Sequence, residues 1–172
     1  MENNKKNLFL IGFMGCGKST MARILSQETG QELIEMDETI EKEAGCTINE
    51  IFETHGESYF RDLESALVER IAQKGGAVVS CGGGAVLRKE NVENMKKNGR
   101  IVYLSATPET IFQRVRYSKN RPLLNGNMNI EFIRQLMEKR LAIYEQSADD
   151  IVCVDGKEKR EIVEELKALG GE

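Results

Sequence analysis

The chain has 172 residues, of which 40% are apolar, and this size suits one domain with a core of its own. Its net charge of −4 comes from acidic and basic residues mixed along the chain, which argues against a nucleic-acid-binding surface. The four cysteines form no C-x-x-C pair, and no stretch approaches the ~20 apolar residues of a membrane span. With no signal region either, we expect a soluble cytoplasmic protein that contacts neither nucleic acid nor membrane.

Five short apolar runs alternate with amphipathic segments along the chain. This alternation predicts βαβ units, and hence an α/β fold in which a five-stranded parallel sheet lies between two layers of helices. The predicted strands are residues 8–11, 32–36, 77–80, 100–104 and 150–154.

Helix boundaries are marked by capping residues and glycines. Thr47 and Glu50 form a capping box, and Thr107 followed by Pro108 is a second strong start signal. Two or three helices are expected between the second and third strands, where a plain crossover needs one. The polar segment 117–129 is expected to be a lid. Other helices are predicted at residues 18–28, 57–74, 129–146 and 157–169.

Residues 12–19 read GFMGCGKS and match the phosphate-binding pattern G-x-x-x-x-G-K-[ST]. The glycines allow successive backbone N–H groups to face a phosphate, and the following helix adds its positive end. We expect Lys18 to reach the β- and γ-phosphates and the Ser19 hydroxyl to bind Mg²⁺. The pattern predicts nucleotide binding but does not identify the acceptor of a phosphoryl group.

Several residues suggest that a second substrate is a small anion. The chain lacks the guanine-reading N-K-x-D, which leaves the small-molecule kinases as the favoured class. Arg140 shares a helix face with apolar residues, so it either contacts a ligand or forms a buried ion pair. Arg61 stands one helical turn before Glu64. The two residues either form an ordinary ion pair at the surface, or Glu64 orients Arg61 for binding a substrate.

Two further features fall at the ends of predicted strands, where α/β folds bind ligands. Gly82, Gly83 and Gly84 indicate either a strained turn or a close approach of the backbone to a ligand. Asp37 either orients a reacting hydroxyl or caps the next helix.

Arg121 in the predicted lid could act as a cation over the phosphates, or be an ordinary loop charge.

Over nearly its whole length the chain resembles the shikimate kinases, P-loop kinases with a fold like that of the nucleoside monophosphate kinases. The resemblance is carried, in order and spacing, by GFMGCGKST, LIEMDETIE, IFETHGESYFRDLE, VVSCGGGAV, RPLL and MEKRLAIY. It implies ATP-dependent phosphorylation of the shikimate 3-hydroxyl with Mg²⁺, by a single monomeric domain. Within that domain, helices at about 37–64 would bind shikimate, and a lid would cover about 115–128.

The resemblance also implies roles for individual residues. Lys18, Asp37 and Arg121 would be catalytic, and Ser19 would bind the metal. Phe52 and Phe60 would pack around the shikimate ring. ATP would contact Gly15, Cys16, Gly17, Lys18, Ser19, Thr20, Arg114 and Arg121. Shikimate would contact Asp37, Arg61, Gly82, Gly83, Gly84 and Arg140.

One departure concerns the end of the second strand, where the family usually has Asp-x-Asp and this chain has Glu35-Met36-Asp37. The resemblance implies that the first acid of this pair lies near the water molecules around the metal. Because Glu35 is longer than aspartate, its role there stays open, although we expect activity to survive. Two alternatives remain, which are a kinase for another acceptor such as gluconate and a nucleotide-binding regulatory module without catalysis. Cys16 is a candidate reactive thiol, because a helix N-terminus favours the thiolate.

Overall fold

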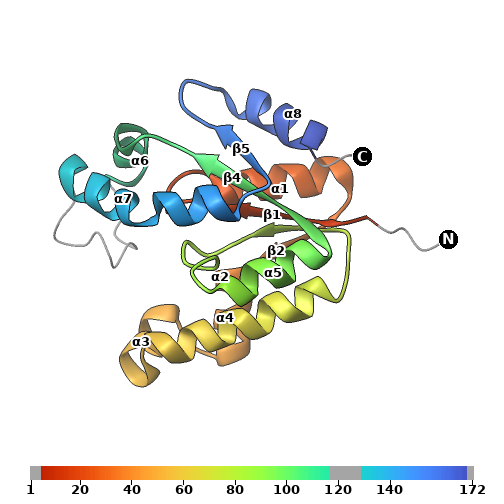
Figure 1. Cartoon of the computed structure of the whole chain (residues 1–172), viewed down its shortest axis with the longest axis vertical. Coiled ribbons are helices and arrows are strands. Elements are labelled where there is room, and N and C mark those ends of the chain that lie inside the picture. The colour runs from red at the N-terminus through yellow and green to blue at the C-terminus, as the bar shows by residue number, and fades with distance from the viewer. Residues whose placement is uncertain (1–4, 117–128, 170–172) are drawn as a thin grey trace.

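The structure is a computed structural model that describes residues 5–116 and 129–169. Five strands form one sheet in the order β2-β3-β1-β4-β5, and every neighbouring pair is parallel (Figure 1). The predicted sheet is therefore confirmed. Its strands are β1 (Asn7–Ile11), β2 (Glu32–Glu35), β3 (Ala77–Ser80), β4 (Gly99–Ser105) and β5 (Asp150–Cys153).

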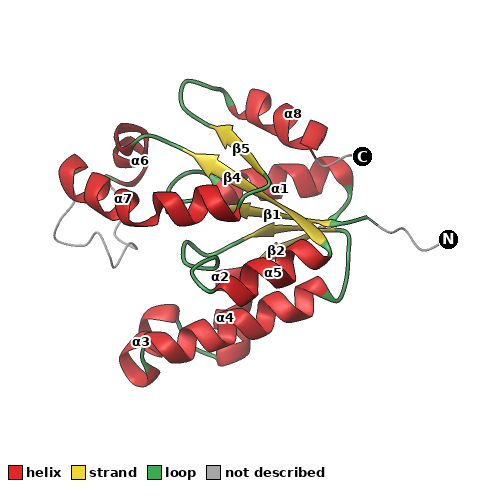
Figure 2. Ribbon diagram, viewed as in Figure 1, coloured by secondary structure: helices red, strands yellow, loops and turns green. Residues whose placement is uncertain are grey.

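Helices cover both faces of this sheet, as the three-layer prediction requires (Figure 2). Helices α1 and α8 pack against each other, and α4 and α5 form another packed pair. In the described ranges, no helix has the length and apolarity needed to cross a membrane. The helices are α1 (Lys18–Thr29), α2 (Met36–Ala44), α3 (Ile48–His55), α4 (Glu57–Ala72), α5 (Lys89–Lys97), α6 (Pro108–Val115), α7 (Ile130–Ser147) and α8 (Lys159–Leu169).

The central strands are short apolar runs because the sheet is covered on both faces. All residues of β1 and β3 are buried, and a strand buried on both sides gains from apolar side chains at every position. The two predicted caps also form, since the side chains of Thr47 and Thr107 each accept a hydrogen bond from the backbone N–H three residues later. Asn129, which was predicted as the first helical residue, caps α7 in the same way. Local sequence and sheet packing therefore specify the same elements.

Several predicted element ends differ from the structure by one or two residues, and one helix was missed. Strand β2 ends at Glu35, because Met36 already begins helix α2. Helix α5 was not predicted, because its sequence KENVENMKK has no continuous apolar stripe. Only Asn91 and Met95 of this helix are buried.

A buried asparagine joins the start of the sheet to the end of α4. Asn7 is 1% exposed. Its amide nitrogen donates to the carbonyls of Ile71 at 3.1 Å and Lys74 at 2.7 Å, and its amide oxygen accepts from the N–H of Ala77 at 3.0 Å. The side chain thus satisfies three backbone groups at the point where α4 returns to β3.

Candidate active site

The phosphate loop follows β1 at the carboxyl edge of the sheet and leads into α1. Gly12, Gly15 and Gly17 have φ values of 150°, 82° and 102°, a region that other residues rarely adopt. A Cβ atom on Gly12 would also lie 2.7 Å from the Cys16 sulfur and 2.7 Å from the Leu104 carbonyl oxygen. The sequence therefore needs glycine both for the curl of the loop and for its packing.

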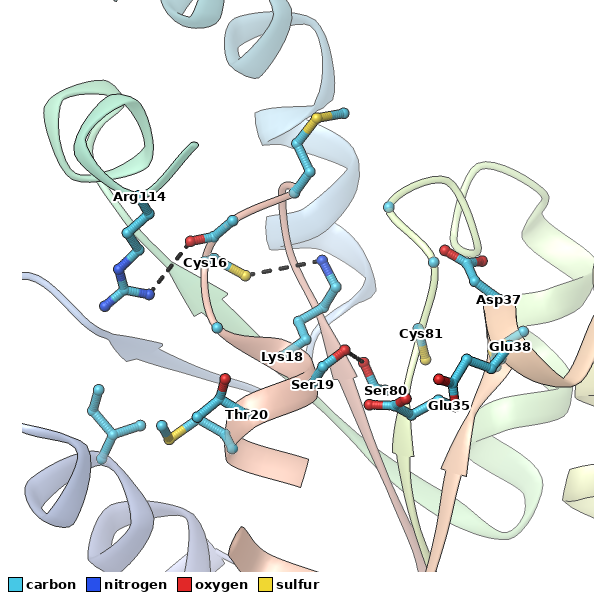
Figure 3. A pocket seen from close by; sticks show the side chains of 18 of the residues that line it. Cys16, Lys18, Ser19, Thr20, Glu35, Asp37, Glu38, Ser80, Cys81 and Arg114 are labelled. Carbon is cyan, nitrogen blue, oxygen red and sulfur yellow. Dashed lines mark hydrogen bonds between the residues drawn. The ribbon is translucent and has the colours of Figure 1, made fainter. Parts of the chain in front are cut away.

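Lys18 and Ser19 open helix α1 on the floor of a cavity of about 530 Å³ (Figure 3). Lys18 is 9% exposed, and its ammonium group donates to the carbonyl oxygens of Gly12 at 2.6 Å and Phe13 at 3.2 Å. The Ser19 hydroxyl lies 3.3 Å from that of Ser80, at the end of β3. Residues 14–21 line the cavity together, so the predicted phosphate contacts Gly15, Cys16, Gly17 and Thr20 all face one space.

The side of the cavity next to Ser19 carries oxygen ligands suited to Mg²⁺. Glu35 ends β2, hydrogen-bonds to Ser19, and has its Oε1 atom buried without a hydrogen-bond partner among the described residues. Burial, followed by the neighbouring Glu38 carboxyl, raises the pKa of Glu35, and the Arg23 guanidinium 4.0 Å away opposes this rise. A buried carboxylate oxygen and a hydroxyl are hard ligands of the kind that Mg²⁺ prefers, so these residues fit the ion.

The opposite side of the cavity is formed by α6 and by the connection from β5 to α8. A nitrogen of the Arg114 guanidinium donates to the Gly15 carbonyl oxygen at 3.4 Å (Figure 3). Lys157, Lys159 and Ile162 complete this wall. Sequence reasoning missed these three residues, although their position after the carboxyl end of a strand was a usable signal.

Asp155 ties the two parts of this wall together. Its carboxylate accepts from the Thr107 N–H at 3.1 Å, from the Thr110 hydroxyl at 2.5 Å and from the Cys153 thiol at 3.5 Å. Burial acts to raise the pKa of Asp155, but these hydrogen bonds outweigh it and hold the pKa below its usual range. These hydrogen bonds attach the start of α6 to the loop that carries Lys157. Arg114 lies in the last turn of the same helix.

The three glycines after β3 are needed because side chains approach their backbone closely. None of them is among the glycines with positive φ, so the strained-turn interpretation is wrong. A Cβ atom on Gly82 would lie 2.8 Å from Asp37 Oδ1, and one on Gly83 would lie 3.2 Å from an Arg140 nitrogen. One on Gly84 would lie 2.6 Å from the Arg61 guanidinium carbon. The run thus collects Asp37, Arg61 and Arg140 around one short stretch of backbone.

Arg61 and Glu64 form a buried pair on α4. Their side chains are 13% and 1% exposed and lie 3.0 Å apart, so the surface-pair interpretation of Arg61 is wrong. Burial raises the pKa of Glu64, and the Arg61 charge opposes that rise. The Phe60 ring lies 5.3 Å from the Arg61 guanidinium carbon and 5.2 Å from the Phe52 ring, so Phe60 lies beside this arginine and Phe52 lies beside Phe60.

Arg140 reaches the same glycines from the opposite side, on α7. The Tyr144 hydroxyl, one turn further along the helix, donates to the Gly83 carbonyl oxygen at 2.6 Å. Within residues 5–116 and 129–169, no ion pair joins the Arg140 guanidinium to a carboxylate, although its charge acts on the buried Glu64 as well as on Tyr144. The buried ion-pair alternative for Arg140 is therefore wrong in this part of the chain.

The predictions for Asp37, Cys16 and Arg121 have three different outcomes. Asp37 is the second residue of α2, after the N-cap Glu35, so its interpretation as a helix cap is wrong. Cys16 is 1% exposed, which shields its thiol from reagents in solution. Arg121 lies outside the described residues, as does all of the predicted lid at 115–128 except Val115 and Arg116.

Comparison with known proteins is consistent with this geometry. A family model described as shikimate kinase matches residues 14–169. The chain belongs to the shikimate kinase family. A shikimate kinase from Persephonella marina is 43% identical over 161 residues, which cover 94% of this chain and 96% of that protein.

Solved structures show the same relationship to shikimate kinases. The shikimate kinase from Acinetobacter baumannii in complex with shikimate has a TM-score of 0.88 at 33% identity, covering 95% of this chain and 92% of that one. A gluconokinase from Sinorhizobium meliloti 1021 has a TM-score of 0.59 at 19% identity, covering 97% of this chain and 92% of that one, which shows a shared fold alone. The predicted P-loop kinase fold is therefore confirmed.

Proposed function

We propose that the protein transfers the γ-phosphate of ATP to the 3-hydroxyl of shikimate, giving shikimate 3-phosphate and ADP. The observation that carries this proposal is the meeting of Arg61 and Arg140 at one glycine run beside the phosphate loop. Two guanidinium groups from different helices suit a carboxylate, because each can donate two parallel hydrogen bonds. The relatives named shikimate kinase support the same substrate.

Catalysis in this proposal consists of positioning and charge neutralisation, as in other phosphoryl transfers. Lys18 would leave the carbonyl oxygens that now hold it and bind the β- and γ-phosphates. Asp37 would accept a hydrogen bond from the reacting hydroxyl and orient it toward the phosphate. Arg121 would approach the same phosphates from the lid, and Arg114 would lie against the base.

The nucleotide and metal would occupy the cavity that the phosphate loop lines. Backbone N–H groups of residues 15–20 would hold the phosphates. Ser19 would be a protein ligand of Mg²⁺, with Glu35 close by, and the ion would supply charge that neutralises the phosphates. Within the described part of the chain, no group of three or more His, Cys, Asp or Glu residues could hold a metal, so ATP and water would provide most ligands.

Other parts of the proposal concern the whole protein. A single cytoplasmic, monomeric domain is what the family resemblance and the mixed surface charge support, with helices α2 to α4 holding shikimate. Neither nucleic acid nor a membrane is proposed as a partner. The two alternatives, a kinase for gluconate and a regulatory module without catalysis, are not favoured by the comparisons, which match shikimate kinases over most of the chain.

A coupled assay of ADP release tests the proposal directly. Wild-type protein is incubated with ATP, Mg²⁺ and one of shikimate, quinate or gluconate. We expect turnover with shikimate well above that with the other two acids, and Arg61→Ala and Arg140→Ala should raise the KM for shikimate while leaving the KM for ATP almost unchanged. Equal turnover with gluconate, or an unchanged shikimate KM in both arginine variants, contradicts the assignment.

A further inference from the structure

Tyr144 occupies a buried position between the two parts of the proposed carboxylate site. It lies on α7 four residues after Arg140, so the two side chains share one helix face. Its side chain is 2% exposed, and its hydroxyl donates to the Gly83 carbonyl oxygen at 2.6 Å. None of the roles described above uses this residue.

The Arg140 guanidinium approaches the same glycine as this hydroxyl. An Arg140 nitrogen and the Tyr144 oxygen lie 3.2 Å and 3.8 Å from the position that a Cβ atom on Gly83 would take. Burial raises the pKa of Tyr144, while the charge of Arg140 and a hydrogen bond from it oppose the rise. The phenol therefore remains protonated at neutral pH, so it donates its hydrogen to Gly83 and accepts from Arg140 with its lone pairs.

The ring that carries this hydroxyl is held rigidly. Tyr103 on β4 stacks on Tyr144, with ring centroids 5.2 Å apart and planes inclined by 27°, and Tyr103 is itself 4% exposed. Arg140, by contrast, has a long side chain with many rotamers, and Gly83 belongs to a run of three flexible glycines. A fixed phenol oxygen can limit the freedom of both.

We propose that Tyr144 is a positioning residue that fixes the Arg140 guanidinium and the Gly83 peptide in one arrangement for binding the substrate carboxylate. This inference rests on the proposed function, because it assumes that Arg140 binds the carboxylate of shikimate. Tyr144 acts through its two neighbours and does not touch the substrate. Its contribution is preorganisation, since a guanidinium already held in place loses less entropy when the ligand binds.

The test is Tyr144→Phe, which removes the hydroxyl and keeps the stacked ring. We expect the KM for shikimate to rise by about tenfold, since hydrogen bonds to charged groups contribute roughly this factor or more, with kcat and the KM for ATP within about twofold of wild type. Calorimetric titration with shikimate should show the same loss of affinity. Thermal unfolding of each variant shows whether the fold is retained.

Tyr103→Phe is the matched control, because it removes a hydroxyl from the neighbouring ring of the same stack. It should leave the shikimate KM within about twofold, as its hydroxyl is not placed between Arg140 and Gly83. The double variant with Arg140→Ala provides the second control. In that background, Tyr144→Phe should change the shikimate affinity by less than about twofold, because the residue to be positioned is gone.

Three results would overturn the inference. They are an unchanged shikimate KM in Tyr144→Phe, an equal rise in Tyr103→Phe, and a full tenfold penalty that persists without Arg140. The test also separates this inference from the proposed function. A folded wild-type protein that shows no turnover with shikimate overturns both, whereas an active wild type with an unaffected Tyr144→Phe variant overturns the positioning role alone.

Discussion

Replacing Gly84 by alanine should damage acid binding without damaging the fold. The added methyl group would lie 2.6 Å from the guanidinium carbon of Arg61. Gly84 is not among the glycines with positive φ, so its backbone accepts alanine without strain. The conflict is therefore with the far end of one long side chain, which can move away.

The size of the effect follows from the distance that Arg61 must move. Ordinary contacts begin at 3.4 Å, and one guanidinium nitrogen lies even closer to the added methyl group than the guanidinium carbon does, so the group has to move by about 1 Å. A displacement near 1 Å can cost roughly a hundredfold in a positioned interaction, and a charged hydrogen bond contributes about 1.5–3 kcal/mol. We therefore expect the shikimate KM to rise by about 10- to 100-fold.

Steady-state kinetics with each substrate varied in turn measures this effect. The KM for ATP should stay within about twofold, and the midpoint of thermal unfolding should fall by no more than a few degrees. In an Arg61→Ala background, Gly84→Ala should have no further effect on the shikimate KM, because the displaced group is absent. A normal KM in Gly84→Ala, or a penalty that persists without Arg61, refutes this account of the glycine.

Three further predictions test other parts of the structure. Lys18→Ala should lower turnover by at least about a hundredfold, because it removes the cation from the phosphates, while fluorescent ATP-analogue titration and circular dichroism show whether binding and fold persist. Asn7→Ala should cost about 2–4 kcal/mol in urea unfolding, because three backbone groups each lose a hydrogen bond and two of these bonds are buried, with both KM values unchanged. Asp155→Asn should raise the KM for ATP about three- to tenfold and reduce stability by about 1–2 kcal/mol at pH 7. Because the pKa of Asp155 is lower in the folded chain, that stability is present above the usual aspartate pKa of about 4 and is lost as the pH falls through the lower folded-state pKa, so the difference between the two proteins in unfolding experiments should shrink as the solution is acidified.

The fold could be predicted from the sequence because its signals are local and strong. Strand β1 is apolar from Leu8 to Ile11 and is followed by a glycine pattern that defines the phosphate loop, and Thr47 and Thr107 mark helix starts by their own hydrogen bonds. Helix α5 could not be predicted in this way, because its polar sequence is stabilised by tertiary contacts, such as the hydrogen bond from the Asn91 amide to the Ala85 carbonyl oxygen.

The site was less accessible to sequence reasoning, because its contacts join segments far apart in the chain. The sequence could identify Arg61 as paired with Glu64, since the two stand one helical turn apart. It could not show that Arg61 and Arg140 approach neighbouring glycines from opposite sides, because this depends on how α4 and α7 pack. For the same reason, the choice between a surface and a buried Arg61 required the tertiary structure.

The placement of the four thiols offers a practical route to a reporter of nucleotide binding. Cys16 and Cys81 are buried beside the phosphate loop, and burial raises the pKa of the Cys81 thiol, so neither reacts readily with maleimides. Cys153 is exposed, whereas Cys46 is half-buried. A dye coupled to Cys153 would stand at the edge of β5, next to the loop bearing Lys157, and its emission could follow ATP binding without any engineered cysteine.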